Sequence, residues 1–279
     1  MLTHLSLFSG IGGLDLAAEW AGIETIGQCE WAEYPYKILC KHWPDVPKWR
    51  DIHTLTKDDF YEKTGLSTVD IISGGFPCQP FSVAGKRRGK KDDRYLWPEM
   101  LRIISELRPD WVVGENVAGI VNMELDTVLS DLEAEGYSTR TFIIPACGVD
   151  APHRRYRCAI VANSNSAGWE KFNIANIPEK KRFIAGGNNT EDVSNGDECR
   201  CRGKQWRQNA QQFTDGSWWA AEPRVGRVAN GVPNRVDRIK CLGNAVVPQQ
   251  FYSIFKAIIE TEKAPCRAGT LAKGKDKKV

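Results

Sequence analysis

One cysteine in the segment 74–82 (GGFPCQPFS) has the surroundings expected of a nucleophile. Cys78 lies between Pro77 and Pro80 just after a predicted strand, so a stiff loop holds its thiol outside the core. Residues 83–97 contain six cations and two anions. Positive potential lowers the pKa of a thiol and favours the reactive thiolate, and the same cations can hold phosphates. An ordinary solvated loop is the alternative, and most of the other eight cysteines are expected to be small buried side chains.

One carboxylate and two arginines are further candidates for chemistry. Glu115 follows the apolar run 111–114, where partial desolvation raises the pKa of a carboxyl toward neutrality and suits it to donate a proton. Arg155 and Arg157 stand at the start of another predicted strand, where alternate residues project to the same side. Two guanidinium groups on one face need an anion or a base edge as partner.

A glycine-rich turn near the N-terminus is a candidate ligand-binding loop. Residues 8–13 (FSGIGG) separate the first predicted strand from the first helix, so backbone amides and a helix N-terminus can approach a ligand. Glu30 and Trp31 end the second predicted strand, where an acid can accept from ribose hydroxyls and an indole can stack on adenine. Asp51 and Ile52 can meet the adenine edge. The alternatives are a plain tight turn, a solvated acid, a core tryptophan and a capping aspartate.

The elements that must position these residues alternate along the first half of the chain. Strands are expected at 2–8, 25–29, 69–73, 110–113, 137–144 and 157–162, and helices at 14–21, 34–42, 96–107 and 126–135. Strands separated by helices of about ten residues predict a parallel α/β sheet. Ligands of such sheets bind beyond the carboxyl ends of the strands, where the candidate residues fall.

The second half of the chain differs in composition. Residues 163–233 are rich in Asn, Gly, Ser and Gln, have poor periodicity and include four tryptophans: Trp169, Trp206, Trp218 and Trp219. This pattern predicts a small irregular second domain. Short helical faces at 234–242 and 248–259 then return, and residues 263–279 form a basic tail that is expected to be disordered. The predicted divisions are thus 1–162, 163–233, 234–262 and 263–279.

Composition excludes several classes of protein. The 279 residues carry a net charge of +3, with a sequence pI near 8.3, which argues against a uniformly basic nucleic-acid coat. The 42% hydrophobic content is enough for a sizeable core, and no apolar run reaches the roughly 18 residues of a membrane span. No secretory signal is visible, and nine irregularly spaced cysteines favour a reducing compartment. Cys199 and Cys201 are too close and isolated for a zinc site, so no metal is expected.

The order of these segments resembles the DNA (cytosine-5)-methyltransferase family, in particular its short bacterial or phage-type members. The glycine turn, Glu30-Trp31, Pro77-Cys78-Gln79, the Glu-Asn-Val segment at 115–117, Arg-x-Arg at 155–157 and Gly-Asn-x-x-x-Pro at 243–248 occur in the family's order. The resemblance covers residues 1–162 and about 235–260. It implies an α/β, Rossmann-like sheet that depends on S-adenosyl-L-methionine, with residues 163–233 as a target-recognition domain.

The resemblance also implies a role for each candidate residue. Cys78 is the nucleophile, Glu115 the acid at the base ring, and Arg155 and Arg157 the clamp on base and phosphate. The cofactor pocket is formed by Phe8, Gly10, Gly12, Glu30, Trp31, Asp51, Ile52, Pro77, Leu96 and Asn244. DNA is contacted by Gln79, Ser82, Lys86, Arg87, Arg88 and Arg94.

The implied substrate is cytosine in a specific sequence of double-stranded DNA, flipped out of the helix before reaction. The implied protein is a monomer in the cytoplasm of a bacterial or phage-infected cell, and a cognate restriction endonuclease is left open.

Three positions depart from the family pattern. Ser6 stands where an acid is usual two residues before Phe8, and His153 stands where a glutamine usually opens the arginine segment. The segment that precedes the closing helix is hard to locate, with Arg224 and Arg227 as candidates. Three other functions are alternatives. The first is an RNA-modifying relative, for which no Cys-Phe-Thr segment is present, and the second is a catalytically inactive DNA-binding module. The third is a nicotinamide dehydrogenase, which explains neither Cys78 nor Glu115.

Overall fold

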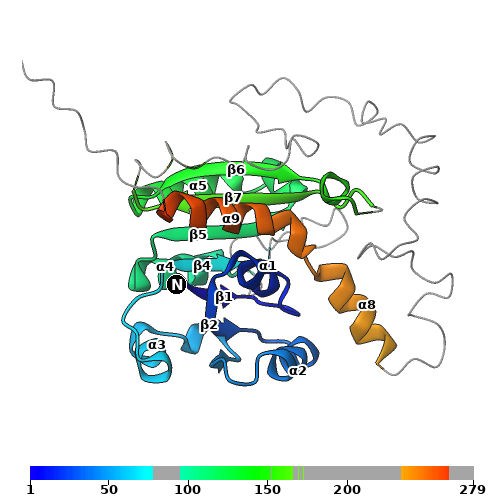
Figure 1. The fold of residues 1–279 in the computed structure, drawn as a ribbon, viewed down its shortest axis with the longest axis horizontal. Coiled ribbons are helices and arrows are strands. Elements are labelled where there is room, and N and C mark those ends of the chain that lie inside the picture. The colour runs from blue at the N-terminus through cyan, green and yellow to red at the C-terminus, as the bar shows by residue number, and fades with distance from the viewer. Residues whose placement is uncertain (78–94, 152, 166–168, 170–171, 173–233, 264–279) are drawn as a thin grey trace, which may run out of the picture.

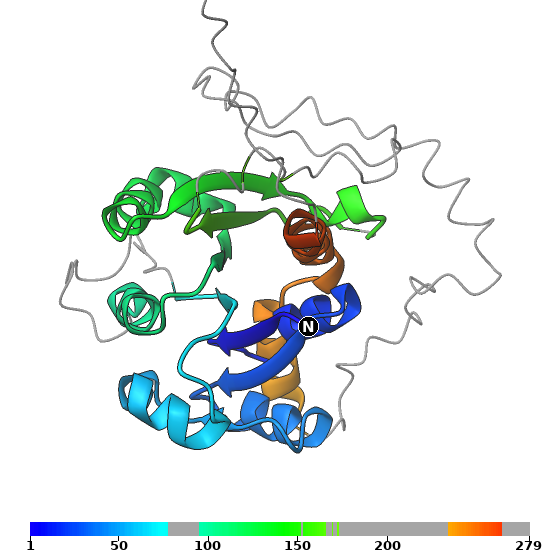
Figure 2. The ribbon, with the colours of Figure 1, turned by 60° about the vertical axis from the view of Figure 1, so that its left-hand side comes forward.

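A seven-stranded sheet with helices on both faces forms the body of the protein (Figures 1 and 2). The computed structural model describes residues 1–77, 95–151, 153–165, 169, 172 and 234–263. The strands are β1 (Thr3–Leu7), β2 (Glu24–Cys29), β3 (Lys48–Trp49), β4 (Ile71–Gly74), β5 (Trp111–Val117), β6 (Ser138–Ile144) and β7 (Arg157–Asn163). The helices are α1 (Gly13–Ala21), α2 (Glu33–His42), α3 (Lys57–Thr64), α4 (Trp97–Leu107), α5 (Leu125–Ala134), α8 (Arg235–Asn244) and α9 (Pro248–Lys263). The Rossmann-like alternation of strand and helix predicted for residues 1–162 is confirmed.

The expectation of a wholly parallel sheet is wrong for its last two pairs. The strand order is β3-β2-β1-β4-β5-β7-β6, and the first five strands run parallel. Strand β7 is antiparallel to both β5 and β6. The physical reason is the short link from β6 to β7, which contains only the 3-10 turn Ala146–Val149 and not the helix that a parallel crossover requires.

The two faces of the sheet have separate apolar cores. On β4, Ile71 belongs to one core and Ile72 to the other, because successive side chains of a strand point to opposite faces. Helices α3, α4 and α5 cover the Ile72 face, whereas α1 and α9 cover the Ile71 face (Figure 2). Trp169 and Phe172, from the predicted recognition region, also pack in the Ile71 core, so that core continues past the end of β7. The carboxyl ends of β1 to β5 are therefore held in fixed relation to one another.

Two elements were missed in the sequence. Strand β3 has only two residues, too few for a period to appear. Helix α3 has little apolar content, but its ends carry ordinary signals: Thr56 Oγ1 accepts from the backbone N–H of Asp59 at 3.2 Å, and Gly65 ends the helix with a φ of 73°.

Among the helices that the structure describes, none is long and apolar enough to span a membrane.

Candidate active site

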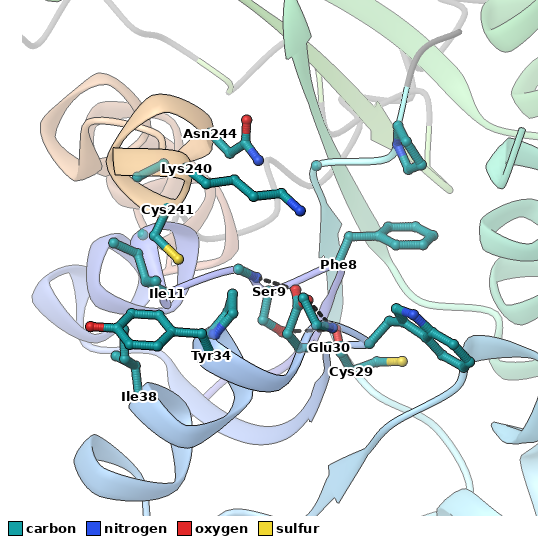
Figure 3. A pocket seen from close by; sticks show the side chains of 18 of the residues that line it. Phe8, Ser9, Ile11, Cys29, Glu30, Tyr34, Ile38, Lys240, Cys241 and Asn244 are labelled. Carbon is teal, nitrogen blue, oxygen red and sulfur yellow. Dashed lines mark hydrogen bonds between the residues drawn. The ribbon is translucent and has the colours of Figure 1, made fainter. Parts of the chain in front are cut away.

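A pocket of about 1390 Å³ opens at the carboxyl ends of β1 to β5, the position that the sequence predicts for a ligand. Eleven of the predicted site residues line it: Phe8, Gly10, Glu30, Trp31, Asp51, Ile52, Pro77, Leu96, Glu115, Arg157 and Asn244. Figure 3 shows how side chains from the glycine turn, α2 and α8 surround the space. The predicted residues Cys78, Gln79, Ser82, Lys86, Arg87, Arg88 and Arg94 lie outside the described residues, as do most of 163–233 and the tail 264–279.

The glycine turn and Glu30 form one hydrogen-bonded unit. Glu30 Oε2 accepts from the backbone N–H of Gly10 at 2.8 Å, and Oε1 accepts from that of Ala32 at 2.7 Å. Glu30 is therefore part of the turn's architecture and not a solvated surface acid. Phe8, with a φ of 53°, takes a left-handed conformation that is rare for a bulky residue and turns the chain sharply into the loop.

The structure also shows whether Trp31 is a core residue and whether Asp51 is a capping residue. Trp31 is 74% exposed on the pocket wall, so it is not a core residue, and its indole is free to stack on a flat ring. Asp51 does cap the 3-10 turn Ile52–Thr54, since its Oδ1 accepts from the backbone N–H of His53 at 3.0 Å. That hydrogen bond, together with the His53 side chain, lowers the pKa of Asp51, so a capping aspartate also borders the pocket.

Gly12 has a different role from the one expected. It does not line the pocket. A Cβ at this position would overlap the ring of Trp43, and the φ of Gly12 is 85°. Gly12 therefore lets the turn pass close to α2, and its contribution to a ligand site is indirect.

We expect Gly12→Ala to destabilise the protein by about 2–4 kcal/mol, because it adds an overlap with Trp43 to the strain of a left-handed alanine. Gly22→Ala is the matched control: Gly22 has a φ of 86°, but nothing lies within 4 Å of its Cβ position. The control should cost about 1–2 kcal/mol. Urea unfolding of the two variants measures the difference, and equal losses would show that Trp43 gives way freely.

A buried acid behind the glycine turn was not predicted from the sequence. Asp15, in the first turn of α1, is fully buried, and its carboxylate accepts from Ser6 Oγ at 2.9 Å and from Gln28 Nε2 at 2.8 Å. Ser6 is the position where the family usually has an acid, so the buried carboxylate is supplied here by α1. One feature of the sequence could have predicted this burial: Asp15 lies among the apolar residues of α1 that face the core, including Leu14 and Ala18.

The free energy of unfolding should depend on the protonation of Asp15. Burial raises the pKa of its carboxyl from 3.8 to about 6, so between these values the folded state binds more protons than the unfolded state. The free energy of unfolding should therefore fall as pH rises from about 4 to 6, by up to about 3 kcal/mol from this group. Asp15→Asn should lose that decline, whereas the exposed Asp58→Asn should keep it. Urea unfolding at pH 4.5 and 7 measures both, and parallel slopes in wild type and Asp15→Asn would contradict the assignment.

Glu115, on β5, is a carboxyl that lines the pocket. Its Oε1 lies 2.7 Å from Nε of Arg157, and both side chains are almost wholly buried. Burial raises the pKa of Glu115, and the positive charges of Arg157 and Arg155 oppose that rise without cancelling it. A Cβ on Gly75 would lie 2.9 Å from Glu115 Oε2, so the carboxyl lies close to the chain just past the end of β4.

The two arginines do not project from one face of a strand as expected. Strand β7 begins at Arg157, and Arg155 precedes it with a φ of 32°. Arg155 Nη2 donates to the carbonyl of Gly243 at 2.7 Å and also to that of Ala245. Arg155 thus fixes the turn between α8 and α9, and only Arg157 meets Glu115 directly.

The chain that leads to Cys78 is anchored beside Glu115. Phe76 is buried with its ring centroid 5.0 Å from that of Trp97, and its carbonyl accepts from Asn116 Nδ2 at 3.0 Å. Cys29 and Cys158 are poor alternatives for a nucleophile, because burial raises the pKa of each thiol to about 12.

Comparison with known proteins finds similarity to one protein family and to several methyltransferases. The family model for C-5 cytosine-specific DNA methylases matches residues 2–221. Type II methyltransferase M.Sau96I from Staphylococcus aureus is 35% identical over 165 residues, which cover 55% of this chain and 37% of that protein. M.HhaI from Haemophilus parahaemolyticus is 29% identical over 188 residues, covering 66% and 55%, and M.AquIA from Picosynechococcus is 33% identical over 175 residues, covering 57% and 71%. The chain spans about half the length of the curated relatives it matches.

The fold is also shared with a solved structure. The S. pombe Dnmt2 methyltransferase aligns with a TM-score of 0.61 at 16% identity, covering 95% of this chain and all of that one.

Proposed function

Because the chain belongs to the C-5 cytosine-specific DNA methylase family, we propose that it is a DNA (cytosine-5)-methyltransferase that uses S-adenosyl-L-methionine and a covalent Cys78 adduct. The observation that carries the proposal is the buried Glu115 carboxyl, which lies close to Gly75, three residues before Cys78. A proton donor and a nucleophile on adjacent strand ends are what addition to a pyrimidine ring requires.

The pocket fits S-adenosyl-L-methionine, which supplies an electrophilic methyl group when bound. Gly10 faces open space, since nothing lies within 4 Å of its Cβ position. Each oxygen of Glu30 already accepts one backbone hydrogen bond and keeps a lone pair for a ribose hydroxyl. The exposed indole of Trp31 offers a face to adenine, and Asp51 and Ile52 border the same end.

The chain's own residues act on the base. The Cys78 thiolate adds to carbon 6 of cytosine, and the electron pair displaced in the ring makes carbon 5 nucleophilic. Glu115 donates a proton or a hydrogen bond to ring nitrogen 3 and so stabilises the charge that the addition creates. After methylation, loss of the carbon 5 proton expels Cys78 and restores the ring. Arg157 holds Glu115 in place by pairing with its Oε1, whereas Oε2 lies near Gly75.

The substrate in this proposal is a cytosine flipped out of duplex DNA, at a cost of a few kcal/mol. In this proposal the cations of residues 83–97, including Lys86, Arg87, Arg88 and Arg94, contact phosphate, and Gln79 and Ser82 also contact the DNA. Residues 163–233 recognise the target sequence. The protein acts as a monomer in the cytoplasm of a bacterial or phage-infected cell.

Radiolabelled methyl transfer tests the proposal. Label from S-adenosyl-L-methionine should enter duplex DNA and not tRNA, and sequencing of methylated sites should show 5-methylcytosine in one short sequence. Transfer to tRNA alone would identify an RNA-modifying enzyme, and binding to DNA without transfer would identify an inactive binding module.

A further inference from the structure

Helix α8 forms a wall of the pocket, and only its last residue, Asn244, was predicted there from the sequence. Asp237, Lys240 and Cys241 line the pocket from this helix. The end of α8 is held by Arg155, which donates to the carbonyl of Gly243. The turn that follows is pressed against the glycine turn, since a Cβ on Gly13 would lie 2.6 Å from Cγ1 of Val246. The helix therefore stands at a fixed place next to the ligand-binding loop.

Some of the cationic side chains around the pocket already form ion pairs with acidic residues of the protein, and others do not. Those that line it in the described part of the chain are Lys37, Lys41, Arg50, Arg157 and Lys240. Lys37 and Arg50 both pair with Glu33, at 3.2 and 2.7 Å. Arg157 pairs with Glu115. These three are therefore committed to anions of the protein itself.

Lys240 and Lys41 are the two pocket cations with no ion pair to any described residue. Figure 3 shows the Lys240 side chain running from α8 into the pocket toward the side where Ser9 and Glu30 lie. Asp237, one turn earlier on α8, borders the same pocket. The helix thus presents one cation and one anion to the space beside the glycine turn.

This charge pattern suits the amino-acid group of the cofactor, for which no charged partner has been named above. Adenine and ribose are matched by Trp31, Asp51 and Glu30, whereas the amino-acid group of the cofactor is a zwitterion with a carboxylate and an ammonium. Building on the proposed function, we propose that Lys240 binds the carboxylate of that amino-acid group. An ammonium that is already held on a fixed helix makes a charge-assisted hydrogen bond to a carboxylate.

Two ligands that differ only in the amino-acid group test this assignment. S-adenosylhomocysteine carries the group, and 5′-methylthioadenosine lacks it. In titration calorimetry without DNA, Lys240→Met should lower the affinity for S-adenosylhomocysteine by about tenfold. The affinity for 5′-methylthioadenosine should stay within about twofold of the wild-type value. Lys256→Met, an exposed lysine of α9 away from the pocket, is the matched control and should change neither affinity.

The outcomes separate the two proposals. If the wild type binds neither ligand, the proposed cofactor is wrong and the role of Lys240 falls with it. If the wild type binds S-adenosylhomocysteine but Lys240→Met binds it equally well, the proposed function stands and the assignment of Lys240 is overturned. The assignment would also be overturned if Lys41→Met, and not Lys240→Met, lowered the affinity for S-adenosylhomocysteine selectively. It would likewise be overturned if Lys240→Met lowered only the affinity for DNA, which would place a phosphate at Lys240.

Discussion

Replacing Cys78 by serine is expected to lower methyl transfer by about 10⁴-fold or more, the scale seen when other enzymes lose their nucleophile. A serine hydroxyl is not ionised near neutral pH, so it cannot add to carbon 6 of the base. The anchored residues before it, with Phe76 buried and its carbonyl bound by Asn116, keep the loop's starting point unchanged. Affinity for S-adenosylhomocysteine should therefore stay within about twofold of wild type.

A trapped adduct distinguishes this role from a structural one. In duplex DNA that contains 5-fluorocytosine, carbon 5 has no proton to lose after methylation, so the enzyme should remain covalently attached to the DNA. The wild type should give a complex that survives denaturing gel electrophoresis, and Cys78→Ser should give none. Cys147→Ser, a half-buried cysteine in the link between β6 and β7, is the control and should trap normally. A trapped complex with Cys78→Ser would assign the nucleophile elsewhere.

Much of the site could be predicted because its residues follow strands directly. The residue types at the ends of β1, β2 and β5 carry their chemistry in a few consecutive positions, and the alternation of elements brings those ends together. Trp31 follows β2 closely, so its position depends on neighbouring residues and a sequence pattern records it well. The hydrogen bond from the backbone N–H of Gly10 to Glu30 joins residues 20 positions apart and depends on the fold.

What could not be predicted depends on residues far apart in the chain. Arg155 reaches Gly243 across 88 positions, and Asp15 is bound by side chains from two different strands. The direction of β7 was missed because the parallel pattern of the earlier strands was extended to the last pair, although no helix is predicted between residues 144 and 157. Lys240 lies on a helix whose sequence resembles any exposed helix, and only its placement beside the glycine turn gives it a candidate role.

Glu115→Gln is expected to lower kcat by about 10²–10⁴-fold, the range for loss of a general acid. Glutamine keeps the size of the side chain and can still offer a weak hydrogen bond to ring nitrogen 3, but it cannot transfer a proton. The substitution also removes the charge that pairs with the buried Arg157, so thermal unfolding must show that the variant is folded at the assay temperature. Glu260→Gln, an exposed residue of α9, is the control and should be fully active.

The pH profile separates an acid from a residue that only positions Arg157. A donor must be protonated, so kcat/KM should fall as pH rises above the pKa of Glu115, which burial raises and the Arg157 charge lowers. Arg157→Met removes the charge that lowers the pKa of Glu115, so burial should raise that pKa further. The pH at which kcat/KM falls, the falling limb of the profile, should therefore be higher in this variant. Glu115→Gln should lose the limb, because its amide does not titrate. If both variants kept the wild-type limb and only lost rate, Glu115 would act through Arg157 and another group would have to supply the proton.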